Sequence, residues 1–305
     1  METIVVDNGS TDGSAELASG RPNVRLIRNP NNAGFAAANN QALETANGEF
    51  VLLLNYDAVL EPRYISILVE SLGADPHRGS ATGKLLRPSV GGEPPLLDST
   101  GHVMYRNVQA TNRGENEPDR SQYDRAEEVF GVCAAAALYR RAMLEDVMIE
   151  GEVLDSTFFS YLEDVDLDWR ARLRGWRSWY EPAAVAVHHR SASGGRFTMP
   201  IQRHIFKNRI LMMIKNDGGA AFYRRLPGTA AFTAAKLLLG IAHGPAFLGA
   251  VSDVVRLYPL ARRKRRLVQS RRTVPAASIE PWFRPYPYGR KLRHGRGAKA
   301  NSPLA

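Results

Sequence analysis

The 305-residue sequence contains one cysteine, no long uninterrupted hydrophobic run, and few acidic residues in its last third. The single Cys133 excludes an intrachain disulfide framework and favours a reducing compartment. Residues 226–255 are strongly apolar but are interrupted by Lys236, His243 and Pro245. They therefore lack the unbroken apolar length that a bilayer span needs. The first residues show no basic region followed by an apolar core, so we expect no signal peptide.

The charged residues divide the chain into an acidic part and a basic part. Residues 1–200 contain 19 Lys and Arg against 28 Asp and Glu, whereas residues 201–305 contain 21 against 3. A basic region can bind nucleic acid, an anionic membrane or an acidic substrate. Nucleic acid is the least favoured partner, because no aromatic and basic RNA-binding pattern and no recognition helix is evident. The basic cluster 262–266 beside the apolar stretch favours anionic lipid headgroups, and the alternative is a solvated helix end.

The most acidic stretch, residues 159–170, still has the pattern of a helix. Apolar residues recur at steps of three and four, at Leu162, Val165 and Trp169 and then at Leu173, just after the stretch. This spacing predicts a helix that buries one face. Asp166 stands four residues before Arg170, and Asp168 stands four before Arg172. Because this spacing is typical of surface ion pairs, we favour a structural role for these two acids.

Glu163 and Asp164 have no such partner in the predicted helix. They lie at its start, where the positive end of the helix dipole favours a carboxylate. A general base requires an ionised carboxylate at the rim of a pocket. These two residues are therefore the candidates for a general base.

Two predicted strands end in polar residues that suit ligand binding. Residues 3–6 form a β-branched run that ends at Asp7, and the apolar run 50–54 is followed by Asn55-Tyr56-Asp57. At the carboxyl end of a parallel strand, Asp7 could accept hydrogen bonds from a base or a ribose. Asp57 could bind a hard divalent cation, although a lone Asp after a strand is more often a helix cap.

Residues 24–27 predict a further strand, and the turn at 29–32 leads into a helix of small residues that starts near Gly34. A glycine at that position lets another backbone, or a phosphate, come close. Residues 88–128 are rich in proline, glycine and charge, which predicts long loops that cover a site.

The run at 183–187 predicts a strand that ends at His188 and His189. Neutral imidazole is a ligand for Mn²⁺-class ions, so a histidine at this strand end is a candidate metal ligand. Consecutive side chains of a strand point to opposite faces, so at most one of the two histidines faces a site. A basic helix is predicted at 202–215.

Four motifs stand in a fixed order along the first two thirds of the chain. They are Val5-Val6-Asp7-Asn8-Gly9-Ser10-Thr11-Asp12-Gly13-Ser14, then Asn32-Ala33-Gly34-Phe35 with Asn39-Asn40, then Leu53-Leu54-Asn55-Tyr56-Asp57-Ala58-Val59-Leu60, then Glu163-Asp164-Val165-Asp166-Leu167 with His188. Together they resemble the family 2 glycosyltransferases, most closely the rhamnosyltransferase-like bacterial branch. The resemblance implies an α/β fold of GT-A type, the nucleotide-diphospho-sugar transferase fold. This is a Rossmann-like mixed sheet flanked by helices, here with a helical basic C-terminal extension.

The resemblance also implies roles for individual residues. Asp7 would contact the nucleotide, and Asn32 and Gly34 would belong to the donor-binding motifs. Asn55-Tyr56-Asp57 occupies the DxD position, where Asp57 would bind a divalent cation, Mg²⁺ or Mn²⁺, and the donor diphosphate. Asp164 would deprotonate the acceptor hydroxyl with the help of Glu163, and His188 would complete the metal shell. A metal that neutralises the leaving diphosphate, with a base on the opposite face, suits an inverting displacement.

The implied activity is transfer of a sugar, with rhamnose suggested by the branch, from a nucleotide-diphosphate donor. The acceptor would be a hydroxyl of a glycan or lipid-linked molecule in bacterial surface or cell-wall polysaccharide synthesis. We expect a cytoplasmic protein, peripherally associated with the inner face of the cell membrane. Its expected parts are a catalytic domain at residues 1–215, a membrane-associating helical region at 216–274 and a basic disordered tail at 275–305.

The sequence departs from the family pattern in two ways. Asn55 replaces the first acid of the DxD motif, which lowers the formal charge of the metal ligands. Family members also carry a further strand and helix before the strand that starts here at Glu2. The alternative hypothesis is therefore an N-terminally incomplete, catalytically impaired remnant that binds a sugar nucleotide or acts as a scaffold.

Overall fold

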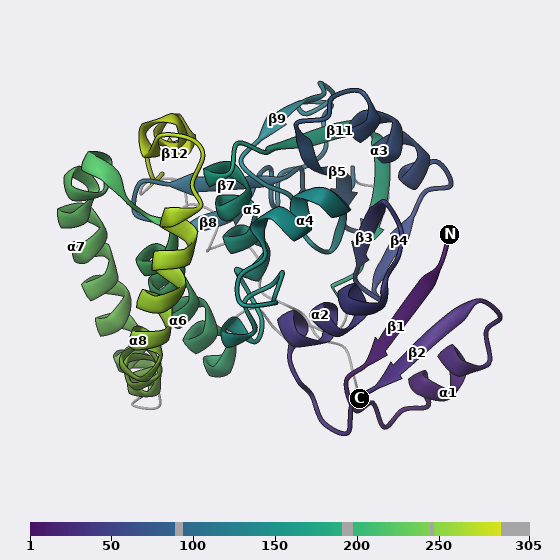
Figure 1. The fold of residues 1–305 in the computed structure, drawn as a ribbon, viewed down its shortest axis with the longest axis horizontal. Coiled ribbons are helices and arrows are strands. Elements are labelled where there is room, and N and C mark those ends of the chain that lie inside the picture. The colour runs from purple at the N-terminus through teal and green to yellow at the C-terminus, as the bar shows by residue number, and fades with distance from the viewer. Residues whose placement is uncertain (89–93, 191–197, 245–246, 288–305) are drawn as a thin grey trace.

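The computed structural model describes residues 1–88, 94–190, 198–244 and 247–287. A central mixed sheet lies between helices, a small N-terminal unit lies at one side of it, and long C-terminal helices lie at the other (Figure 1). This arrangement confirms the expected α/β class. The expected tail beyond residue 287 lies outside the described residues.

The N-terminal unit is a parallel pair of strands joined by a helix. Strand β1 (Thr3–Asp7) pairs with β2 (Val24–Arg28), and α1 (Ser14–Ser19) connects them. The β-branched residues of β1 favour the extended conformation, and the next helix, α2 (Phe35–Thr45), packs against this strand. In the described residues these two strands form a sheet of their own beside the central sheet (Figure 1).

The central sheet has the strand order β3-β10-β5-β11-β4, with β6 paired to β5 and β9 paired to β11. Strand β11 runs parallel to β5, and the other pairs are antiparallel. The strands are β3 (Phe50–Leu54), β4 (Ala58–Leu60), β5 (Arg78–Leu86), β6 (Leu97–Ser99), β9 (Glu127–Val129), β10 (Ala136–Arg140) and β11 (Arg177–His188). The strands predicted at 50–54 and 183–187 are confirmed.

Helices cover both faces of this sheet, so its central strands are buried on both sides. Helix α3 (Tyr64–Gly73) packs on one face, where Leu68 and Leu72 contact buried residues of β5 and β10. Helices α4 (Arg141–Val147) and α5 (Glu163–Leu173) pack on the other face. This packing places the carboxyl end of β11 and the start of α5 near the same edge of the sheet (Figure 1).

The prediction of long loops at 88–128 is wrong for part of the described segment. It contributes β6 and β9 to the central sheet, and β7 (His102–Tyr105) pairs with β8 (Ala110–Asn112). Each of these strands has only three or four residues. Strands this short form only through pairing with their partners. The proline, glycine and charged residues around them predict loops, so no sign of these strands is visible in the sequence.

Three helices form the C-terminal part: α6 (Met199–Asn216), α7 (Gly219–His243) and α8 (Leu248–Ser270). The helix predicted at 202–215 is confirmed as α6. Within the described residues, none of the helices is both long and apolar enough to cross a membrane. Residues of α5, α6 and α8 share one hydrophobic core, in which Trp169 contacts Leu211 and its neighbours. The C-terminal helices therefore pack directly on the acidic helix.

The basic cluster at 262–266 lies in α8, and three of its residues bind protein groups. Arg263 pairs with Glu150 at 2.6 Å, and the buried Lys264 lies 2.7 Å from Asp155. Arg265 donates to backbone carbonyls at the end of α6 and just after it. The prediction that this cluster faces lipid headgroups is therefore wrong for Lys264 and Arg265, which hold α8 against the rest of the molecule, whereas Arg263 remains exposed at the surface.

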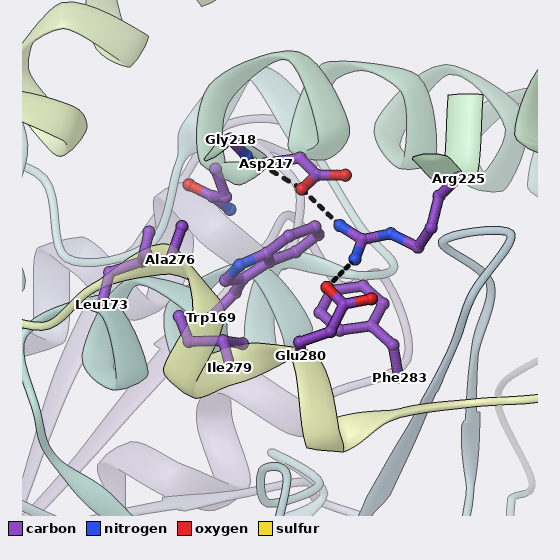
Figure 2. Close-up of a pocket in the computed structure, with 10 residues that line it drawn as sticks. Trp169, Leu173, Asp217, Gly218, Arg225, Ala276, Ile279, Glu280 and Phe283 are labelled. Atoms are coloured by element: carbon purple, nitrogen blue, oxygen red, sulfur yellow. Dashed lines mark hydrogen bonds and ion pairs between the residues drawn. The ribbon is translucent and has the colours of Figure 1, made fainter. Parts of the chain in front are cut away.

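The segment after α8 is ordered through residue 287, contrary to the expected disorder from 275. It forms η3 (Ala276–Trp282) and β12 (Phe283–Arg284), which pairs with β7. Figure 2 shows Phe283 against Trp169, with ring centroids 5.3 Å apart, and Arg225 between two carboxylates. The cavity among these side chains has a volume of about 10 Å³, room for about one water molecule. This packing fixes the segment on α5.

Candidate active site

Helix α5 is buried on nearly all sides, with ten of its eleven residues buried. Asp166 does pair with Arg170, at 2.9 Å, but both side chains lie inside the protein. The predicted pair of Asp168 and Arg172 is not formed. Arg172 donates instead to the backbone carbonyl of Phe130 at 2.5 Å. The helical spacing assumed a face open to solvent, whereas the C-terminal helices cover that face.

Asp168 faces away from Arg172, toward the segment before β10. Its Oδ2 lies 2.8 Å from Nδ1 of His102 and accepts a hydrogen bond from the backbone N–H of Val132 at 3.0 Å. Burial raises the pKa of Asp168 to about 6, and the neighbouring His102 opposes this rise. Asp168 is therefore a buried hydrogen-bonded carboxylate rather than a surface acid.

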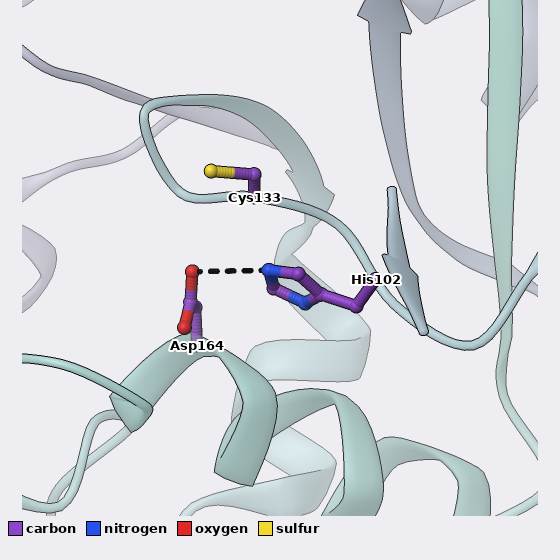
Figure 3. Close-up of side chains that lie close together, drawn as sticks. All are labelled: His102, Cys133 and Asp164. Carbon is purple, nitrogen blue, oxygen red and sulfur yellow. Dashed lines mark ion pairs between the residues drawn. The ribbon is translucent and has the colours of Figure 1, made fainter. Parts of the chain in front are cut away.

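Asp164 lies at the first turn of α5 with its carboxylate half-buried. One oxygen, Oδ1, accepts from the backbone N–H of Val165 at 2.8 Å. The other, Oδ2, accepts from the N–H of Ala134 at 3.2 Å and lies 3.5 Å from Nε2 of His102 (Figure 3). The candidate base is therefore held between its own helix and the segment before β10.

Glu163 is more deeply buried than Asp164. Burial and the neighbouring Asp164 raise its pKa well above the ordinary range. Its Oε2 has no hydrogen-bond partner among the described residues. The raised pKa favours the protonated carboxyl group, which can donate a hydrogen bond to a substrate, and this fits the expected assisting role.

Asp57 and His188 meet at the ends of two neighbouring strands of the central sheet. Strand β4 pairs with β11 so that Ala58 stands opposite His188, and the imidazole Nε2 lies 3.2 Å from Oδ1 of Asp57. Asn55 reaches the same ring nitrogen at 3.5 Å. His189 is exposed, so only one histidine of the pair faces the site, as the strand geometry predicts.

A second carboxylate, Asp98, orients His188. Its Oδ2 lies 2.8 Å from Nδ1 of the ring, and its side chain is fully buried. Arg190 pairs with the same carboxylate, and Arg87 lies 3.1 Å from it. Burial opposes the charge of Asp98, but His188 and Arg190 outweigh it and lower its pKa. Nδ1 is thus held by Asp98, and Nε2 points at Asp57.

These residues fit a divalent cation of the Mg²⁺ or Mn²⁺ type. A ligating histidine commonly has its other ring nitrogen bonded to a carboxylate, as His188 does with Asp98. Such cations take one or two protein carboxylates and complete their shell with water and substrate phosphates. Asp98 was missed by the sequence reasoning because it lies in the segment predicted to be loops, where no local pattern marks it.

One short segment, residues 134–135, contacts both Asp164 and the turn that carries Asp57. The N–H of Asn55 donates to the carbonyl of Ala135 at 2.9 Å, and the N–H of Ala134 donates to Asp164. Burial and Glu163 raise the pKa of Tyr161, and Arg190, which pairs with Asp98, opposes the rise. The structure therefore brings the acidic helix and the Asp57–His188 pair to one edge of the sheet.

Asp7 lies in the N-terminal unit, at the wall of an open hollow of about 490 Å³. Its carboxylate accepts from the N–H of Ser10 at 3.3 Å, and Arg28 also lines the hollow. Residues between Asp7 and Pro30 of the N-terminal unit line this hollow.

Asn32 and Gly34 form a turn that packs against the acidic segment. The side chain of Asn32 accepts from the N–H of Gly34 at 2.9 Å. Gly34 has φ of +86°, and a Cβ added there would lie 2.6 Å from the ring and the carbonyl oxygen of Phe159. The sequence left open whether a backbone or a phosphate approaches this glycine. The structure places a backbone and an aromatic ring there.

The fold identifies the class of the protein. It is the nucleotide-diphospho-sugar transferase fold of GT-A type. The solved structure "Crystal structure of GalNAc-T7 with UDP, GalNAc and Mn2+" aligns with a TM-score of 0.53 at 12% identity. The alignment covers 70% of this chain and 41% of that chain. At this identity the likeness shows the fold alone.

Residues 1–148 match the family model of glycosyl transferase family 2, and the chain carries a domain of this family. It is 29% identical over 218 residues to an N-acetylglucosaminyl-diphospho-decaprenol L-rhamnosyltransferase of Mycobacterium tuberculosis, covering 64% of this chain and 69% of that protein. It is 25% identical over 187 residues to a poly-beta-1,6-N-acetyl-D-glucosamine synthase of Staphylococcus aureus. That match covers 60% of this chain and 42% of the synthase. The resemblance inferred from the four motifs is confirmed.

Proposed function

We propose that the protein is an inverting, metal-dependent glycosyltransferase. It transfers a sugar from a nucleotide-diphosphate donor to a hydroxyl of a glycan or lipid-linked acceptor in the synthesis of a bacterial surface or cell-wall polysaccharide. One observation carries this proposal: the N–H of Ala134 donates to Asp164, the carbonyl of the next residue accepts from Asn55, and the turn that starts at Asn55 carries Asp57, which pairs with His188. A base and a cation site thus lie at one edge of the sheet.

In the proposed reaction, Asp164 takes the proton of the acceptor hydroxyl. The oxygen of that hydroxyl forms a bond to the anomeric carbon of the donor sugar, and the bond from this carbon to the diphosphate oxygen breaks. Asp57 and His188 would hold the cation, which supplies charge neutralisation for the departing diphosphate. The hollow beside Asp7 would receive the nucleotide. Attack from the face opposite the leaving group inverts the anomeric configuration.

The donor and the acceptor can be proposed only by chemical class. The mycobacterial relative is named for transfer of L-rhamnose to a diphospho-decaprenol-linked sugar. A rhamnosyl nucleotide and a polyprenyl-diphosphate-linked sugar are therefore the first pair to test. Other nucleotide sugars, including an N-acetylglucosaminyl donor, form the comparison set.

The test measures nucleoside diphosphate release and labelled product with each donor, in the presence of Mg²⁺ or Mn²⁺. Asp164→Asn keeps the side-chain volume but cannot accept the proton, so we expect turnover to fall by about 10²- to 10⁴-fold. Asp75→Asn is the matched control, since Asp75 precedes β5 at the opposite edge of the sheet. Full activity of Asp164→Asn would refute the proposal. Donor binding without turnover in the unmodified protein would favour a binding or scaffolding role.

We also propose that α8 contributes to association with an anionic membrane surface. Leu248, Val255 and Tyr258 are exposed, at 50%, 68% and 45%. With the exposed Arg262 and Arg266 they recur at steps of three, four and seven, which places them on one face of the helix. An apolar and basic face of this kind suits anionic lipid.

Sedimentation with phosphatidylglycerol vesicles tests this association, with phosphatidylcholine vesicles as the comparison. Val255→Glu should reduce binding to the anionic vesicles, because it adds a negative charge to the exposed face. Leu17→Glu is the control, since Leu17 is exposed on α1 in the N-terminal unit. Equal binding to both kinds of vesicle, or no effect of Val255→Glu, would exclude the proposed face.

A further inference from the structure

His102, the first residue of β7, is buried between two carboxylates of α5. Its Nδ1 lies 2.8 Å from Oδ2 of Asp168, and its Nε2 lies 3.5 Å from Oδ2 of Asp164 (Figure 3 shows the second contact). Its backbone N–H donates to the carbonyl of Gly131 at 2.8 Å. The ring is therefore fixed by both its backbone and its side chain.

The segment before β10 is shaped to admit Asp168. A Cβ added to Gly131 would lie 1.8 Å from Oδ2 of Asp168, so only a glycine lets the carboxylate reach the N–H of Val132. Asp168 is thus held by one backbone group and one ring nitrogen of His102. Asp168 binds only Nδ1 of the His102 ring. The other nitrogen, Nε2, is directed at Asp164, the candidate base.

Burial disfavours a charge on His102, but the carboxylates of Asp164 and Asp168 outweigh it and raise the pKa of the ring well above the ordinary value. The thiol of Cys133, in the segment before β10, adds a smaller contribution in the same direction. The raised pKa favours the imidazolium, which can donate from both nitrogens. The ring lies among three acids, Asp164, Asp168 and Glu163.

We propose that His102, oriented by Asp168, is a positioning residue for Asp164, an inference that rests on the function proposed above. The carboxylate of Asp164 offers about four lone-pair sites. Two backbone N–H groups occupy two of them, and Nε2 of His102 lies 3.5 Å from Oδ2, at ion-pair distance. Together these three groups fix the plane of the carboxylate and leave room for the acceptor hydroxyl. His102 itself does not touch the substrate.

The experiment compares His102→Gln, His102→Phe and Asp168→Asn in the full chain. We expect kcat to fall by about 10- to 100-fold in each variant, the usual effect of losing an orienting partner, with little change in the donor KM. The pH profile of kcat should also change in the two His102 variants, because the ring with the raised pKa is lost. Gln should retain more activity than Phe, since it can still donate a hydrogen bond.

His77→Gln is the matched control, since His77 is exposed at the turn before β5. Donor binding by calorimetry and the urea unfolding midpoint separate a positioning effect from a general loss of structure. If Asp164→Asn abolishes turnover but His102→Gln keeps the wild-type kcat and pH profile, the positioning role is refuted and the proposed function stands. If Asp164→Asn is itself active, the proposed function is refuted, and the positioning role that rests on it is refuted as well.

The same side chains could instead bind a soft metal, because ligand atoms of His102, Cys133 and Asp164 lie within 4.8 Å of one another. Added Co²⁺ tests this possibility through a thiolate charge-transfer absorption. Stoichiometric Co²⁺ binding that disappears in Cys133→Ala would overturn the positioning role. Absence of that absorption, together with the shifted pH profile, supports it.

Discussion

Lys215, near the end of α6, stands in a network of charges inside the protein. Its side chain is 1% exposed, and its Nζ lies 2.8 Å from Asp166. It also bonds to Asp155, which pairs with Lys264 of α8 at 2.7 Å. Asp166 in turn pairs with Arg170 within α5. One cation thus connects α6 to the acidic helix and to the carboxylate that holds α8.

The substitution Lys215→Met removes this cation and keeps most of the side-chain volume. Breaking a buried ion pair typically costs 3–5 kcal/mol, since the remaining charge stays buried. Here each carboxylate keeps another cation, Asp155 through Lys264 and Asp166 through Arg170. We therefore expect the low end of that range, a loss of about 3 kcal/mol in the free energy of unfolding.

Urea denaturation followed by circular dichroism measures this loss, and urea leaves the charges unscreened. Arg263→Met is the matched control, because Arg263 pairs with Glu150 at the surface of the same helix and its side chain is 57% exposed. We expect no measurable change of its unfolding midpoint. A loss below about 1 kcal/mol for Lys215→Met would refute the reasoning that this network holds the C-terminal helices on the family domain.

Three further predictions follow from the site. Asp57→Asn should raise the Mn²⁺ concentration needed for half-maximal activity at least tenfold, and a chelator should abolish wild-type activity; equal metal dependence in both proteins would contradict the assignment. Gly34→Ala should lower stability by about 1–3 kcal/mol in urea, because its Cβ would meet Phe159; an unchanged midpoint would show that this contact yields easily. Lys215 and Lys264 outweigh burial and hold the pKa of Asp155 below its usual range, so its contribution to stability is present above about pH 4 and is lost as the pH falls further. Urea midpoints that stay constant from pH 6 to pH 3 would contradict this last expectation.

The elements predicted correctly are those whose signal lies in adjacent residues. The continuous apolar run of β3 and the apolar run before His188 are local patterns, and both strands are present. Strands β6 to β9 are not marked in this way, because each has three or four residues and depends on a distant partner. Whether such a short strand forms depends on pairing with its partner more than on the periodicity of its own residues.

The site was predicted in part for the same reason. Asp57, Asp164 and His188 belong to motifs that can be read from neighbouring residues, and the structure places them at one edge of the sheet. Asp98 and His102 orient His188 and Asp164 from the segment predicted to be loops. No short pattern indicates that a strand end will carry an orienting group, so only the three-dimensional arrangement identifies them.

The ion pairs of α5 and of the 262–266 cluster show a different limit. Spacing within a helix finds the nearest opposite charge along the chain and assumes that both side chains face solvent. Asp168 instead meets His102, 66 residues earlier, and Lys264 meets Asp155, 109 residues earlier. The composition shows correctly that the C-terminal third has an excess of basic residues. It does not show that some of them, such as Lys264, form ion pairs inside the protein.

The segment that leads into α5 shows why the C-terminal helices matter to the site. Phe159, Tyr161 and Leu162 all have positive φ, a conformation that is unfavourable for large side chains. The amide nitrogen of Asn208, on α6, lies 2.7–3.0 Å from the carbonyl oxygens of Phe158, Ser160 and Tyr161. These contacts stabilise the turn that sets where Asp164 lies. Helix α6 therefore acts on the proposed base through the backbone, so the family domain and the C-terminal helices together form the site.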